Sequence, residues 1–317
     1  MTIVALSNAA TPRARRAVPE LRDALPESPS VRHHVSDTAE AADAVVAGTD
    51  WRPDDVLVIN GGDGSVQRAL TLLLHTRDAA ALPRIACLPG GSTNMTAFDL
   101  NEHRRYRDCL VSLRRLAANP EALPEAPRPV VRVESPGLAP APCGLFFGAG
   151  TIVQGVEYFQ TRLRGDGGRH ELTAGAALAR TLWGVARSEP PFDAPLAATV
   201  SAPPLWPQET PLSLRLLLAT TLDRLFLGIR AYWGDGPGRL RTTAVEARAP
   251  GFLRRMPRLL RGAPDPDMVP AAGYHSGRVD ALCLTFDGSF TLDGELFTGS
   301  GDRMRVGATD PVRFLPL

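Results

Sequence analysis

The sequence contains no lysine. All 35 basic residues of the 317-residue chain are arginine, and 34 acidic residues leave a net charge of +1. A Walker A phosphate loop and the protein-kinase fold both need a lysine, as do Schiff-base and pyridoxal phosphate chemistry. Those enzyme classes are therefore excluded. The near-zero net charge gives no bulk attraction to nucleic acid, so we expect no nucleic-acid partner.

Cysteine clusters and long apolar runs are also missing. The four cysteines lie far apart with no C-x-x-C pair, so we predict neither a zinc site nor a disulfide framework. No apolar run is long enough to cross a membrane, and no basic segment precedes the first short apolar run. These absences predict a cytoplasmic protein with no transmembrane segment.

The first third of the chain alternates short apolar runs with helical patterns. This alternation is typical of an α/β domain with a parallel sheet. The predicted strands are Thr2–Ser7, Val31–Val35, Val56–Ile59 and Arg84–Leu88, and the predicted helices are 12–25, 41–47, 65–75, 96–100 and 107–117.

We predict that a proline-rich stretch over 119–128 is a linker. After it, the hydrophobic pattern becomes typical of β-strands. The strand candidates after it are 130–134, 145–147, 212–220, 239–245, 279–285 and 289–292, with helices predicted over 152–164 and 174–187. We therefore predict an α/β domain over 1–125, a β-sandwich-like domain over 126–305, and a C-terminal segment, 306–317, that packs back on the first domain.

Two glycine-rich turns follow neighbouring predicted strands. The first is Gly61-Gly62-Asp63-Gly64-Ser65, and the second is Pro89-Gly90-Gly91-Ser92-Thr93-Asn94. Glycines let a ligand approach the backbone, and a following helix offers its N-terminal N–H groups to an anion. Because ligands of open α/β sheets bind at the carboxyl ends of the strands, two such turns predict a phosphate or nucleotide site.

Asp63 is unexpected next to a phosphate because like charges repel. It fits if Mg²⁺ lies between the two, or if Asp63 takes a proton from an attacking hydroxyl. The plainer alternative is a tight turn in which Asp63 only caps the helix that follows.

The pair G-G-D-G-[ST] and P-x-G-[ST]-x-N-x-x-A resembles the diacylglycerol kinase catalytic domain superfamily, which includes bacterial lipid kinases and sphingosine kinases. Asn8 stands where that family has an N-P-x-x-G turn, and Ser36 stands where it has a threonine at the nucleotide pocket. Asp293-Gly294-Glu295 matches its D-G-E motif. The resemblance is specific in the two turns and loose between about 135 and 285.

The resemblance implies an ATP- and Mg²⁺-dependent lipid kinase that joins an α/β domain like that of NAD kinases to a β-sandwich domain. Its acceptor would be diacylglycerol or a sphingoid or ceramide-like lipid at the inner face of the membrane. Asp63 and Glu295 would be catalytic, and Asp63 would also be the metal ligand. The nucleotide-binding residues would be Asn8, Ser36, Gly61, Gly62, Gly64, Ser65, Gly91, Ser92, Thr93 and Asn94.

Two departures from the family pattern affect the substrate and the activity. Met95 replaces an aspartate that many bacterial members carry, and Gln154, with Glu157 one turn later, stands where some members have a substrate-contacting aspartate. Gln154 and Glu157 are therefore our substrate-site candidates. A catalytically impaired nucleotide- or lipid-binding relative is the alternative, and an NAD kinase, which shares G-G-D-G-T, ranks below it.

Overall fold

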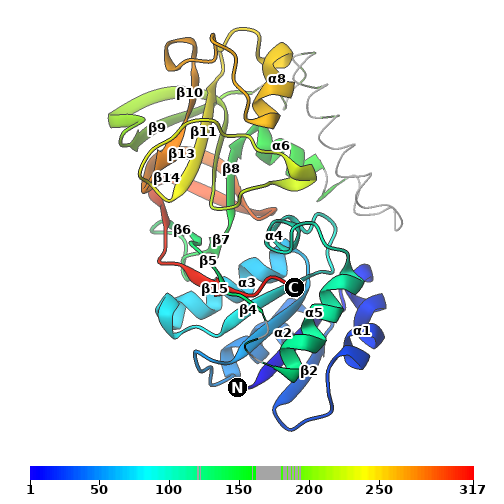
Figure 1. Cartoon of the computed structure of the whole chain (residues 1–317). Helices are drawn as coiled ribbons and strands as arrows, with labels where there is room; N and C mark the ends of the chain where they lie inside the picture. The colour runs from blue at the N-terminus through cyan, green and yellow to red at the C-terminus, as the bar shows by residue number, and fades with distance from the viewer. Residues whose placement is uncertain are drawn as a thin grey trace. The chain divides into compact units, whose positions relative to one another are not determined.

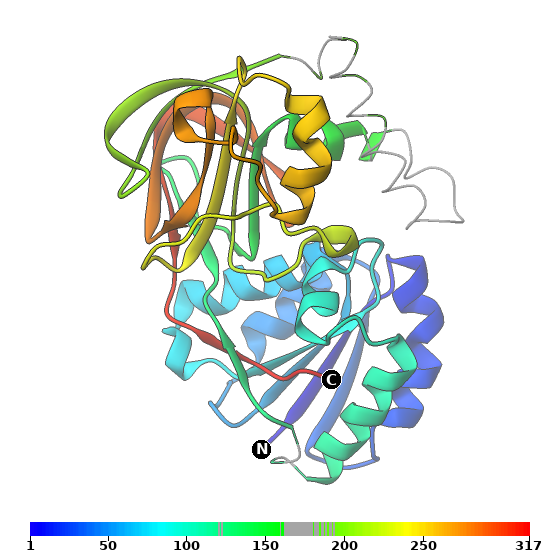
Figure 2. The same ribbon diagram turned by 45° about the horizontal axis from the view of Figure 1, so that its top comes forward.

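The structure is a computed structural model, shown in Figure 1 and, turned by 45°, in Figure 2. It describes residues 1–119, 121, 123–158, 160–161, 180, 184, 187, 189, 192 and 194–317. The chain forms two compact units: unit 1 is Met1–Val130 with Thr309–Leu317, and unit 2 is Val131–Ala308. The predicted helix over 174–187, and the end of the one over 152–164, lie largely outside the described residues.

Unit 1 is a six-stranded sheet, in the order β2-β1-β3-β4-β15-β5, with helices on both faces. All neighbours pair in parallel except β5, which runs antiparallel to β15. This confirms the predicted parallel α/β domain. Its elements are β1 (Ile3–Asn8), α1 (Pro12–Ala24), β2 (Val31–Ser36), α2 (Ala39–Gly48), β3 (Val56–Gly61), α3 (Asp63–Thr76), η1 (Ala79–Ala81), β4 (Arg84–Pro89), α4 (Met95–Leu100), α5 (Tyr106–Ala118), β5 (Ala126–Arg128) and β15 (Val312–Phe314).

Two layers of helices bury the central strands of unit 1. Alternate residues of β1, β3 and β4 pack against α1 and α5, as the period of two along a strand requires, and α2 and α3 pack together. The cluster under α1 and α5 comprises Ile3, Ala5, Val56, Val58, Ala86 and Leu88 with Leu21, Ala24, Cys109, Leu110, Leu113 and Leu116. Because both faces are covered, the strands are continuous apolar runs rather than alternating ones.

Unit 2 is β-rich, as predicted. Its strands are β6 (Val131–Glu134), β7 (Cys143–Gly144), β8 (Phe146–Gly150), β9 (Leu196–Ala202), β10 (Trp206–Thr220), β11 (Leu240–Glu246), β12 (Tyr274–Val279), β13 (Ala281–Leu292) and β14 (Glu295–Ala308). Its helical segments are α6 (Thr151–Tyr158), η3 (Phe226–Gly228), α8 (Phe252–Arg261) and η4 (Pro270–Ala272).

The described strands of unit 2 form one antiparallel network in the order β12-β11-β10-β8-β13-β14-β6-β7. Strand β9 pairs with both β10 and β13. Since β14 pairs with β13 along its whole length, β9 and β8 occupy the other edge of β13 one after the other. The long strands curve (Figure 1) and enclose a core that includes Phe147, Leu217, Leu284 and Phe290.

Within the described part of the chain, no helix combines the length and the hydropathy needed to cross a membrane.

Candidate functional site

The two glycine turns of unit 1 contact each other backbone to backbone. They follow β3 and β4, which are neighbours in the sheet, and the Gly90 amide donates to the Gly61 carbonyl at 3.1 Å. A Cβ on Gly91 would lie 2.3 Å from the Gly62 Cα, and one on Gly90 would lie 2.6 Å from Asn60 Oδ1. No side chain fits in these gaps, so the close approach of the two turns requires glycine.

Asp63 joins the two turns. It is the first residue of α3 and is buried, and its carboxylate accepts three hydrogen bonds from the second turn. The donors are Thr93 Oγ1 at 2.6 Å, the Met95 amide at 3.0 Å and the Thr96 amide at 2.8 Å. Those amides open α4, where a negative charge is favoured. Asp63 therefore caps a helix, but the helix is α4 of the second turn and not the one that follows Asp63.

These contacts limit what else Asp63 can bind. A carboxylate has about four acceptor positions, and protein donors fill three of them. Across the described residues, no group of three or more His, Cys, Asp or Glu side chains is placed to hold a metal ion. Asp63 is therefore not part of a cage of protein ligands in the described residues, and its role as a metal ligand together with nucleotide phosphates stays a prediction. One acceptor position, on Oδ1, stays available.

The first turn of α3 is the helix N-terminus still open to an anion. The amides of Asp63 and Gly64 begin this helix and have no intrahelical partner, whereas the first amides of α4 are held by the Asp63 carboxylate. Half-buried polar groups lie beside this turn: Asn8 Nδ2 donates to Ser65 Oγ at 3.0 Å. The start of α3 therefore has the features of an anion-binding helix N-terminus.

Asn94 and Ser36 have mainly structural contacts. Asn94 is buried in the left-handed conformation, with φ 50°, and its side chain closes the second turn. Its Oδ1 accepts from the Gly91 amide at 2.6 Å and its Nδ2 donates to the Gly91 carbonyl at 2.9 Å. Ser36 is buried at the end of β2, where its carbonyl accepts from the Ala9 amide. Ser92 and Thr93 are half-buried at the second turn.

A polar chain beneath the first turn was not predicted from the sequence. Asn60 Nδ2 donates to Ser7 Oγ at 2.9 Å and to the Ala14 carbonyl at 3.2 Å, and Ser7 Oγ lies 2.9 Å from His33 Nε2. Burial first, then the positive charge of Arg22, lowers the pKa of His33. The signal in the sequence was a polar residue at the end of each of two otherwise apolar strands.

The D-G-E motif forms the turn between β13 and β14 in unit 2. Asp293 is buried at φ 51°, and its carboxylate accepts from the amides of Leu145, at 2.9 Å, and Phe146, at 2.9 Å. It therefore fixes the start of β8. Glu295 is partly exposed, and no hydrogen bond or ion pair of its carboxylate is found among the described residues. Of the three motif residues, Glu295 is the one available for a ligand.

Gln154 and Glu157 lie on α6, in the same unit as Glu295. Gln160, just beyond α6, donates from Nε2 to the Gly294 carbonyl at 2.8 Å and links this region to the β13–β14 turn. Among the described residues, Gln154 Oε1 is buried without a hydrogen-bond partner, whereas Glu157 is partly exposed. A buried acceptor without a donor is costly, so Gln154 is the better placed of the two to receive a hydrogen bond from a ligand.

A comparison with known protein families gives a match for most of unit 1. The profile of the diacylglycerol kinase catalytic domain family matches residues 1–121, which include both glycine turns and Asp63. This match supports a kinase, that is, a phosphotransferase. No protein with a curated description matches the chain in sequence.

Solved structures support the fold of the whole chain. A diacylglycerol kinase from Bacillus anthracis str. Sterne is 12% identical, with a TM-score of 0.63, over 100% of this chain and 97% of that one. A second structure from the same organism has a TM-score of 0.66 at the same identity and coverage. At this identity the likeness shows a shared fold, and the alignment covers both units of this chain.

Proposed function

We propose that this protein transfers the γ-phosphoryl group of ATP to the hydroxyl group of a lipid, either diacylglycerol or a sphingoid or ceramide-like lipid. The observation that carries the proposal is the N-terminus of α3, which has no side-chain cap and stays open to phosphate beside the contact of the two glycine turns. Phosphoryl transfer depends mainly on positioning and charge stabilisation, so a site built from backbone amides suits it.

In this proposal the nucleotide phosphates lie against the amides of Asp63 and Gly64, beside the hydroxyls of Ser65 and Ser92. Asn8, held against Ser65, supports the same end of the sheet. ATP would arrive as its Mg²⁺ complex, in which the ion is bound by the phosphates and belongs to the substrate. With no lysine in the chain, the positive charge at the phosphates comes from that ion, from the helix N-terminus and from arginine.

Asp63 has two roles in the proposal. Its three hydrogen bonds hold the second turn against the first, and the free acceptor position on Oδ1 takes the proton of the lipid hydroxyl. Gln154, whose Oε1 has no partner within the part of the chain that the structure describes, would accept a hydrogen bond from the lipid head group. Glu157 on α6 and Glu295 after the β13–β14 turn, both partly exposed in unit 2, complete the proposed substrate region.

The test is transfer of radiolabelled phosphate from ATP to a total lipid extract, with products separated by thin-layer chromatography. We expect one Mg²⁺-dependent lipid product, which is lost in Asp63→Ala. The proposal would be wrong if no lipid product formed and if the parent protein and Asp63→Ala consumed ATP equally. Tight ATP binding without turnover would instead indicate an impaired relative, and formation of NADP from NAD would indicate the NAD kinase alternative.

A further inference from the structure

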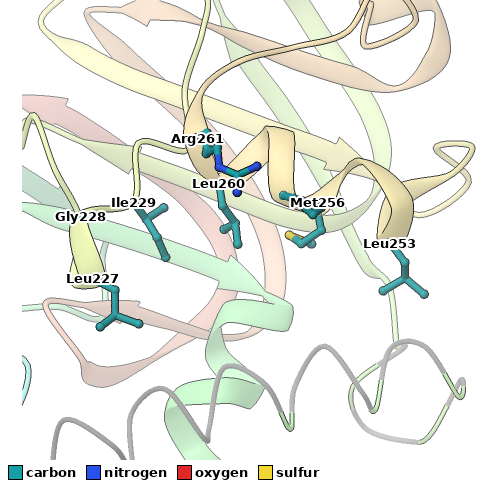
Figure 3. Close-up of a pocket in the computed structure, with 8 residues that line it drawn as sticks. Leu227, Gly228, Ile229, Leu253, Met256, Leu260 and Arg261 are labelled. Atoms are coloured by element: carbon teal, nitrogen blue, oxygen red, sulfur yellow. The ribbon is translucent and has the colours of Figure 1, made fainter.

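An apolar groove crosses the surface of unit 2 between α8 and the η3 turn. It has a volume of about 470 Å³, and its apolar lining includes Leu227, Ile229, Leu253, Met256 and Leu260. In Figure 3 these side chains extend toward the same side of the ribbon. The Arg230 amide donates to the Leu260 carbonyl at 2.9 Å, which fixes the η3 loop to the end of α8. The groove is therefore formed by two elements that are bonded to each other.

Two leucines at the ends of the groove are unusually exposed. Leu227 is 62% exposed and Leu253 is 41% exposed. Leu227 also has φ 56°, a conformation that costs free energy for a residue other than glycine, asparagine or aspartate. The turn that holds it is closed by a 2.7 Å bond from the Leu225 amide to the Ile229 carbonyl. A strained and closed turn thus holds an apolar side chain in solvent.

Helix α8 carries a stripe of arginines beside its apolar stripe. Arg254, Arg258 and Arg261 follow the i, i+4, i+7 spacing of one helix face, and Leu253 and Leu260 lie one position before Arg254 and Arg261. The three arginines are exposed, and within the described residues no ion pair within 4.0 Å is found for them. The helix contains no acidic residue. An exposed apolar stripe next to an arginine stripe is the pattern of an interfacial helix.

The fourth arginine of α8 is buried and bonded to acidic residues, unlike the three exposed ones. Arg255 is buried and donates to Asp265 at 3.1 Å and to Asp267 at 2.6 Å. It also donates to the Pro250 carbonyl, and its guanidinium lies over the Tyr274 ring. Asp265 and Asp267 are thereby engaged with Arg255 and do not form ion pairs with the three exposed arginines of α8, so the exposed face of the helix keeps a positive charge.

We propose that α8 and the η3 turn form the surface on which this protein docks to an anionic phospholipid bilayer. Leu227 and Leu253 enter the boundary between head groups and acyl chains, while Arg254, Arg258 and Arg261 bind lipid phosphates. The role of this docking rests on the proposed function, since a lipid acceptor would reside in the bilayer. The positive charge and the exposed leucines select an anionic bilayer as the occupant.

The test is co-sedimentation of the full chain, without ATP, with vesicles of phosphatidylglycerol and phosphatidylcholine or of phosphatidylcholine alone. We expect stronger binding to the anionic vesicles. Each arginine near an anionic surface contributes about a fivefold change in partition, so R254Q/R258Q/R261Q should weaken binding to them by about a hundredfold. L227N/L253Q should weaken binding to both vesicle types by about tenfold, and asparagine suits the positive φ at position 227.

The matched control is R107Q/R114Q/R115Q, which removes the same charge from exposed positions on α5 of unit 1. Unchanged binding in this control, with unchanged melting temperatures in all variants, would support the proposal. Equal losses of vesicle binding in this control and in R254Q/R258Q/R261Q would overturn the proposal. It would also be overturned if L227N/L253Q converted a dimer to a monomer and left vesicle binding unchanged.

A second assay separates this proposal from the proposed function. Phosphorylation of a short-chain, water-soluble diacylglycerol needs no bilayer. Its rate should therefore be unchanged in R254Q/R258Q/R261Q and in L227N/L253Q. Vesicle binding without phosphoryl transfer would leave the docking surface standing and reject the lipid kinase. If L227N/L253Q raised the KM for the soluble lipid and left vesicle binding unchanged, the groove would be an acyl-chain subsite and the docking proposal would fail.

Discussion

Asp63 shows how one side chain can connect two motifs that lie 30 residues apart in the chain. Its carboxylate accepts from Thr93 Oγ1 and from the first amides of α4, so the second turn depends on a residue of the first. The spacing of the motifs placed both turns at one edge of the sheet, but it did not indicate this bond. A hydrogen bond between distant residues follows from backbone geometry that no local pattern encodes.

Substitution of Asp63 by asparagine should destabilise the protein. The amide group would place N–H against the N–H and O–H donors that the carboxylate now accepts, at a cost of about 1–3 kcal/mol. Thr93→Val removes one of the three donors and should cost about 1 kcal/mol. Urea denaturation of both variants measures these costs, and an unchanged unfolding free energy in Asp63→Asn would contradict the cap.

The same pair of variants separates positioning from proton transfer. If Asp63 also accepts the proton of the lipid hydroxyl, Asp63→Asn should lose far more kcat than Thr93→Val. Thr93→Val should keep the pH dependence of kcat/KM of the parent protein, because its carboxylate is intact. Equal losses of kcat in the two variants would leave Asp63 with a positioning role alone.

His33 should make the stability of unit 1 depend on pH. Burial and Arg22 lower its pKa below the unfolded value of 6.5, so the unfolded chain binds the proton more readily than the folded one. Stability is therefore present at neutral pH and is lost as the pH falls through about 6.5 toward the lowered folded pKa. Unfolding free energies measured from about pH 7.5 to 5.5 should fall, and His33→Gln should reduce that slope.

The control for this prediction is His75→Gln, which replaces an exposed histidine near the end of α3. It should leave the slope unchanged. A slope that is as steep in His33→Gln as in the parent protein would show that another group is responsible.

At the scale of elements, the sequence predicted the order and type of β1 to β4 and α1 to α5 and placed most of their ends within a few residues, but it missed β15 and assigned β5 to a linker. Thr11 and Pro12 open α1 as expected from the preference for proline at the first helical position. Helix α2 begins two residues earlier than the predicted 41–47, and Thr38 caps it, with Oγ1 accepting from the Ala41 amide. Several adjacent polar residues can cap a helix, and the backbone conformation selects one.

The contact between the glycine turns gives a prediction for Gly91. An alanine Cβ there would meet the Gly62 Cα, which is backbone and has no room to move, so Gly91→Ala should cost about 1–3 kcal/mol and weaken ATP binding. Gly48→Ala is the matched control, because nothing lies within 4 Å of its added Cβ. That control should be neutral or stabilising by up to about 1 kcal/mol. Thermal melting and ATP titration measure both effects.

At the scale of the whole molecule, the chain leaves unit 1 at Val130 and returns to it at Thr309. Strand β15 then inserts between β4 and β5, where the Leu315 amide donates to the Ile85 carbonyl and the Leu317 amide donates to Asn101 Oδ1. Because the last strand completes the sheet that carries the glycine turns, residues 1–130 lack part of their own core.

Truncation after Ala308 should therefore unfold unit 1. It would remove four fully buried side chains, Val312, Phe314, Leu315 and Leu317. At about 1.5–3 kcal/mol each, their loss approaches the total stability of a typical domain. Limited proteolysis should show residues 1–130 degraded in the truncated protein. Phe314→Leu in the full chain, which keeps most of the volume, should remain resistant and active, and equal resistance of the truncated chain would contradict the prediction.

The sequence by itself determined the two-part organisation, the parallel sheet and the glycine turns, because these follow from hydrophobic periodicity and from residues with strict backbone preferences. The absence of lysine also restricted how phosphate can be bound, since it left backbone amides, arginine and ions carried by the substrate. Tertiary structure alone decided that Asp63 caps α4 rather than α3 and that Asn94 closes its own turn. It also decided that Leu227 and α8 share one surface. These features depend on contacts between segments distant in the chain, whose geometry is fixed only when the sheets are packed.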